Sequence, residues 1–143
     1  MKHVFVYGTL RAGEINDIGA AAARNGISTP RLVGRAAVTG RLYDLGDYPG
    51  LVQDEAAGPV RGDVYEIDDA LVPVLDRIEG IEPGGEGVFK SRELTVTVAD
   101  RELRCFFYPV DDVSVSGRTR IEAGDWISYR LARDSVAMLE YGH

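Results

Sequence analysis

The chain has 143 residues, 45% of them hydrophobic and 27% charged, which is the size and composition of one soluble globular domain, so we predict a single domain over residues 1–143. Its 16 basic residues stand against 23 acidic ones, and the resulting net charge of −7 repels polyanions, so we expect no nucleic-acid partner. No apolar run reaches the length of a membrane span, so no membrane association is expected.

The N-terminal third begins without a recognisable signal peptide, because the apolar run after Met1-Lys2 is short and lacks a cleavage site. Residues 3–7 are rich in β-branched and aromatic side chains and stop at Gly8, which predicts a buried first strand and then a turn. Residues 14–25 contain an alanine block followed by Gly26, which predicts a short helix.

The middle and the last part of the chain favour further strands. Residues 32–55 carry short apolar stretches interrupted by glycines and by a Tyr48-Pro49-Gly50 turn, which predicts strands with bends. Residues 60–67 form the next predicted strand. Residues 88–98 and 102–108 alternate between apolar and polar side chains, so the short link between them predicts a hairpin.

One helix is expected among these strands, over residues 68–79. Aspartates cap its start, Pro73 fits only near its first turn, and Gly80 ends it. The glycine-rich segment 83–87 is expected to be a loop. Many short strands with one or two helices predict an α+β fold with a curled or closed sheet.

Glu79 is the main candidate for chemistry in the chain. It shares a helical stripe with Leu71 and Leu75, and a carboxylate at the end of an apolar stripe is partly desolvated. Desolvation raises the pKa of a carboxyl group toward the range of a general base or acid. The alternative is a glutamate turned outward, or one paired with Arg77 or Arg92.

The turn at residues 7–10 is a second candidate, because successive N–H groups in such a turn can bind an anion. Gly8 permits backbone geometry closed to other residues, and Thr9 adds a hydroxyl group. The alternative is a simple turn that ends a strand.

Histidine and cysteine chemistry is not expected. The only histidines, His3 and His143, lie at opposite ends, so we predict no metal site, no serine triad and no cofactor. Cys105 cannot form an internal disulfide, which favours a cytoplasmic location. Cys105 and Trp126 are both predicted to lie in the core.

Several segments, in this order, resemble the gamma-glutamylcyclotransferase-like family. The chain opens with Val4-Phe5-Val6-Tyr7-Gly8-Thr9-Leu10-Arg11, which is similar to the opening signature of that family. The later segments similar to family segments are Gly40–Leu45, Tyr48–Val52, Gly62–Ile67, Leu75–Gly80 and Gly124–Trp126.

This resemblance implies a small mixed β-barrel flanked by short helices, a small-molecule gamma-glutamyl substrate, and a catalytic role for Glu79. It implies that the substrate's carboxylate binds at Tyr7, Gly8, Thr9 and Leu10. Tyr48 and Tyr108 are candidates for the rim of the pocket, since a tyrosine tolerates both a buried ring and a wet hydroxyl.

The implied reaction is attack of the substrate's α-amine on its γ-carbonyl, which closes 5-oxoproline and releases an amine or amino acid. Two alternatives are a hydrolase on the same scaffold and a binding domain without catalysis. The chain departs from many members at Asn16-Asp17 and at residues 89–92, which concerns the leaving-group side. Arg11 is expected either on the surface or on the substrate's carboxylate, and a substrate contact by Arg92 stays open as well.

Overall fold

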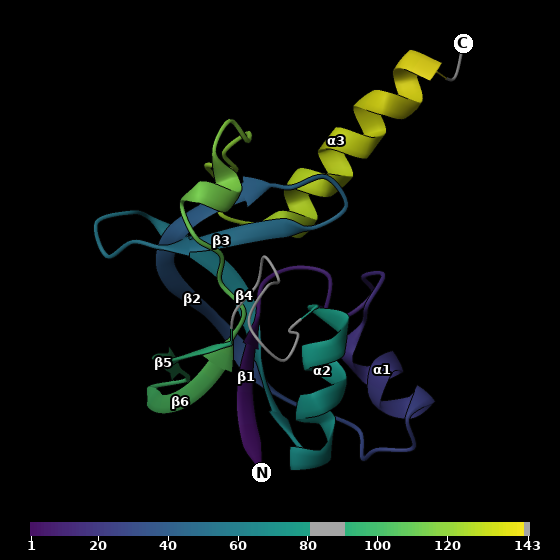
Figure 1. The fold of residues 1–143 in the computed structure, drawn as a ribbon, viewed down its shortest axis with the longest axis vertical. Coiled ribbons are helices and arrows are strands. Elements are labelled where there is room, and N and C mark those ends of the chain that lie inside the picture. Colours follow the sequence, from purple (N-terminus) through teal and green to yellow (C-terminus); the bar gives the residue numbers. More distant parts are fainter. Residues whose placement is uncertain (81–90, 142–143) are drawn as a thin grey trace.

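The computed structural model of the chain describes residues 1–80 and 91–141, with side chains described up to residue 136 (Figure 1). Its strands are β1 (Lys2–Val6), β2 (Arg31–Asp44), β3 (Pro49–Gln53), β4 (Pro59–Ile67), β5 (Arg92–Val98) and β6 (Arg101–Phe107). Its helices are α1 (Ile18–Arg24), α2 (Val72–Ile78) and α3 (Trp126–Tyr141), with short 3-10 turns η1 (Asp69–Leu71) and η2 (Val113–Val115).

The strands form one mixed sheet in the order β3-β2-β4-β1-β6-β5. Strand β1 pairs antiparallel with β4 and parallel with β6. The sheet curls so far that a Cβ atom added at Gly34 of β2 would lie 2.8 Å from Val98 of β5, although several strands separate the two in the sheet. The expected α+β fold, a curled mixed β-barrel architecture with short helices, is therefore confirmed in the form of a half-barrel.

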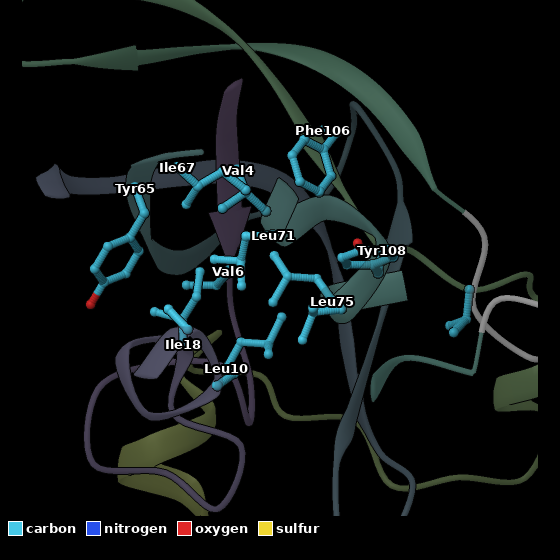
Figure 2. Packing of buried hydrophobic residues seen from close by; sticks show 14 of the residues in the cluster. Val4, Val6, Leu10, Ile18, Tyr65, Ile67, Leu71, Leu75, Phe106 and Tyr108 are labelled. Atoms are coloured by element: carbon cyan, nitrogen blue, oxygen red, sulfur yellow. The ribbon is translucent and has the colours of Figure 1, made fainter. Parts of the chain in front are cut away.

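Strand β1 divides the interior into two hydrophobic clusters, because its side chains alternate between the two faces of the sheet. Val4 and Val6 pack with residues of α1 and α2, whereas Phe5 and Tyr7 pack with Trp126 and the β5–β6 hairpin. Figure 2 shows the first cluster, where Leu71 and Leu75 lie among Val6, Ile18 and Leu10. The turn that follows β1 therefore begins at a strand that is packed on both faces.

The helical predictions are confirmed with shorter bounds. Helix α1 begins only at Ile18, because the Asp17 side chain caps it by accepting from the N–H groups of Gly19 and Ala20. Helix α2 has its proline in the first turn, and Gly80 follows with a φ of 71°, the left-handed geometry that ends helices at glycine. In the described part of the chain, no helix combines the length and apolarity needed to span a membrane.

The predicted hairpin is also present. Strands β5 and β6 pair antiparallel and are joined by Ala99 and Asp100, which both adopt positive φ angles of 48° and 64°. Two such residues are what a tight two-residue hairpin turn requires. The predicted loop at 83–87 and the start of the predicted strand at 88 lie outside the described residues.

Candidate active site

One pocket collects every site residue expected from the sequence. It lies where the turn after β1 faces the start of β3 and the end of α2. Its lining consists of Phe5, Val6, Tyr7, Gly8, Thr9, Leu10, Tyr48, Pro49, Glu79 and Tyr108. All the site residues expected from the sequence therefore line one pocket, and the structure adds Phe5, Val6 and Pro49 to its lining.

Glu79 is the one ionisable carboxylate among these lining residues. It follows directly after α2, and Leu71 and Leu75 on the same stripe are fully buried. Burial raises the pKa of Glu79 to about 7. Neither Arg77 nor Arg92 forms an ion pair with Glu79 among the described residues, so the alternative of a glutamate paired with one of these arginines finds no support there.

The turn at residues 8–11 is closed by a hydrogen bond from the Arg11 N–H to the Gly8 carbonyl at 3.1 Å. The N–H groups of Gly8, Thr9 and Leu10 have no acceptor within residues 1–80 and 91–136. A turn that lines a pocket with free N–H groups can hold an anion there.

The predicted reason for a glycine at position 8, an unusual backbone geometry, is wrong. Its φ is not positive, so the turn does not need unusual backbone geometry at this position. Instead, a Cβ atom at Gly8 would lie 2.7 and 2.8 Å from the ring of Pro49. Glycine is therefore required because the two walls of the pocket approach each other closely here.

Two buried tyrosines form the inner wall. The Tyr7 hydroxyl donates to the Tyr108 carbonyl at 2.6 Å and accepts from the Leu51 N–H at 3.2 Å. The Tyr108 hydroxyl donates to Asp76 Oδ1 at 2.7 Å. Burial raises the pKa of both tyrosines, and the charge of Glu79 adds to both shifts, so both hydroxyls remain protonated near Glu79.

Tyr48 stands on the outer wall and is 39% exposed, unlike the two inner tyrosines. The loop that carries it is held by α3, because Arg133 donates to the Asp44 carboxylate and, at 2.6 Å, to the Gly46 carbonyl. Tyr48 is thus the solvent-exposed tyrosine of the pocket lining.

The remaining sequence candidates lie elsewhere. Arg11 is held by Asp63 at 2.9 Å and by Asp125 at 3.0 Å, so it ties the first turn to β4 and to the start of α3 and does not line the pocket. Arg92 borders a separate hollow. Cys105 and Trp126 are fully buried in the second hydrophobic cluster, which confirms the prediction that both belong to the core.

Two supporting residues were missed by sequence reasoning. The Asn16 side chain donates to the Thr9 hydroxyl at 3.1 Å and so braces the first turn. Asp76, which lies about one helical turn before Glu79, accepts a hydrogen bond from the Tyr108 hydroxyl. The spacing of three residues between Asp76 and Glu79 was a usable signal, because side chains three apart on a helix lie on the same face.

The comparisons with known proteins bear on this pocket. The family model described as "Gamma-glutamyl cyclotransferase, AIG2-like" matches residues 4–128, which include every residue of the pocket. The chain belongs to this family. The sequence resemblance that pointed to it is confirmed.

Individual members of the gamma-glutamyl cyclotransferase family are similar over most of the chain. The family protein YtfP of Escherichia coli is 32% identical over 126 residues, which cover 87% of this chain and 95% of YtfP. The rat gamma-glutamylaminecyclotransferase is 29% identical over 76% of this chain and 77% of its own. The crystal structure of a mouse AIG2-like protein superposes with a TM-score of 0.64 at 26% identity, covering 77% of each chain.

Proposed function

We propose that this protein converts a gamma-glutamyl amine or a gamma-glutamyl amino acid into 5-oxoproline and the free amine, with Glu79 as the catalytic acid and base. The observation that carries the proposal is the Glu79 carboxylate itself, which is desolvated, has no ion-pair partner in the described structure, and lines the same pocket as the free N–H groups of residues 8–10. Family membership supports the reaction class.

In the proposed reaction the nitrogen of the substrate's α-amine forms a bond to its own γ-carbonyl carbon. Glu79 takes a proton from the α-ammonium and delivers it to the leaving nitrogen as the γ-amide bond breaks. The second proton that the attacking nitrogen loses on ring closure passes to the released amine, which departs as its ammonium. A pKa of about 7 suits both steps, because such a group accepts and returns a proton near neutral pH. Closing a ring within one molecule gains from high effective molarity, so the protein needs mainly to hold the folded chain.

The polarity of the pocket supports a zwitterionic substrate head. On one wall, the turn at residues 8–10 offers N–H donors that suit an α-carboxylate. On the other, Glu79 supplies a negative charge that suits an α-ammonium. The γ-glutamyl group carries both charges on one carbon, so it can use both walls at once.

A product assay in heavy-oxygen water tests the proposal. We expect γ-glutamyl amines and γ-glutamyl amino acids to give 5-oxoproline without solvent oxygen, because cyclisation consumes no water. Mass spectrometry reads the label directly. Glutamate carrying heavy oxygen in its γ-carboxylate as the first product would overturn the proposal in favour of hydrolysis, and absence of any turnover would favour a binding domain.

An α-N-acetylated substrate gives the matched comparison. Acetylation removes most of the nucleophilicity of the nitrogen and the proton that Glu79 is proposed to take, so this compound should be inert. Release of N-acetylglutamate would instead indicate that water attacks the γ-carbonyl.

A further inference from the structure

The hydroxyl of Tyr108 has its proton committed away from the pocket. A phenol carries one proton, and an ionised carboxylate can only accept, so the 2.7 Å contact with Asp76 must place that proton between the two groups. The lone pairs of the Tyr108 oxygen are then left as acceptors. Tyr108 lines the pocket, and the charge of Glu79 acts on its hydroxyl, so this acceptor lies near the Glu79 carboxylate.

Tyr7 repeats the same arrangement next to it. Its proton goes to the Tyr108 carbonyl at 2.6 Å, and one of its lone pairs already accepts from the Leu51 N–H. Neither inner tyrosine therefore has a hydroxyl proton left to donate to a ligand. With Glu79 beside them, this wall contains acceptors and a negative charge, which is the lining that an ammonium group requires.

We infer that Asp76 is a positioning residue: it takes the proton of the Tyr108 hydroxyl, and it thereby turns the Tyr108 oxygen into a hydrogen-bond acceptor for the substrate's α-ammonium beside Glu79. This inference rests on the proposed function, because it assumes a substrate with an α-ammonium. A purely structural role, in which the contact only ties α2 to the end of β6, makes different predictions.

The test measures binding without turnover, in the Glu79→Gln variant. Two ligands are compared, a γ-glutamyl amine and the glutaryl amide of the same amine, which has hydrogen in place of the α-amino group. We expect the γ-glutamyl compound to bind at least about tenfold more tightly, as is typical of a hydrogen bond to a charged group. Adding Asp76→Ala should reduce this preference at least fivefold, through weaker binding of the γ-glutamyl compound alone.

Matched variants separate positioning from structure. Asp76→Asn keeps a carbonyl oxygen that can accept the Tyr108 proton, so it should restore most of the preference. Asp69→Ala removes a charge from exposed η1, away from the pocket, and should leave the preference unchanged. Tyr108→Phe should lose the preference on its own, and adding Asp76→Ala to it should change little more, because the two residues act as one unit.

Equal weakening of both ligands by Asp76→Ala, or an unchanged preference, would overturn the inference. If Asp76→Ala does not fold, Tyr108→Phe decides by the same criterion. Equal binding of the two ligands to the Glu79→Gln parent would also overturn it, since no ammonium would then be recognised. The heavy-oxygen product assay uses the wild-type protein and decides the proposed function separately.

Discussion

Glu14 is a buried glutamate and Glu79 a half-buried one, and an ion pair distinguishes them among the described residues. The Glu14 side chain is 5% exposed and receives two hydrogen bonds from Arg130, at 3.0 and 2.7 Å. Glu79 receives none from the described residues, and burial raises its pKa to about 7. A buried carboxylate with an arginine partner serves the fold, whereas one without a partner has a proton to exchange near neutral pH.

The largest expected effect separates the two glutamates by activity. Glu79→Gln should lower kcat by about 100- to 10,000-fold, because the amide keeps the shape but cannot exchange the proton. Substrate affinity should fall far less than kcat, because the amide loses the charge but keeps an oxygen that can accept from the α-ammonium. Steady-state kinetics and binding to the inactive variant measure both quantities.

Glu14→Gln is the control for that experiment. It should leave kcat of the folded protein within a few-fold and instead destabilise the fold by about 2 kcal/mol, because Arg130 loses its buried charged partner and keeps only Asp134 among the described residues. Wild-type turnover in Glu79→Gln, or a loss of kcat in Glu14→Gln of the same size, would remove the distinction between the two residues.

The second effect concerns stability against pH. Glu79 binds its proton more tightly in the folded state, with a pKa of about 7 against an ordinary value of 4.5, so the folded state is destabilised as pH rises between these values. Glu79→Gln should therefore be more stable than wild type by up to about 3 kcal/mol above pH 7, and equal to it below about pH 4.5. Urea unfolding at pH 8 and pH 4.5 measures this, and a constant difference would contradict the shifted pKa.

A third, smaller effect is on KM, and it concerns the turn at residues 8–10 on the wall opposite Glu79. Gly8→Ala places a methyl group against the Pro49 ring, so the turn must shift and KM should rise about tenfold with a smaller change in kcat. Gly58→Ala is the matched control, since nothing lies within 4 Å of a Cβ atom there. Equal KM values for the two variants would show that the turn at residues 8–10 does not hold the substrate.

The last prediction is that a metal chelator has no effect on the catalytic rate. The described lining of the pocket contains one carboxylate and neither histidine nor cysteine, so a strong chelator should leave the rate unchanged. Loss of activity that zinc or magnesium restores would reveal a site that the described residues do not form.

The fold and the candidate site residues could be predicted from the sequence, because both depend on local residue patterns. The Leu71–Leu75–Glu79 stripe and the strand ending at Gly8 are readable from residue spacing and from the resemblance to the family. The contacts between residues that lie far apart in the sequence could not be predicted. Gly8 contacts Pro49, Arg11 contacts Asp63 and Asp125, and Tyr108 contacts Asp76. The fold brings these distant segments together, and no periodicity in the sequence encodes the pairings.

A direct titration of the Glu79 carboxyl group tests the central claim. Carbon-detected NMR of protein labelled at the glutamate carboxyl carbons would follow it, with the signal assigned by its absence in Glu79→Gln. The account predicts a midpoint of about pH 7 in the free protein. A midpoint near the ordinary value of 4.5 would contradict it, because Glu79 would then be an ordinary solvated carboxylate and a poor proton carrier at neutral pH.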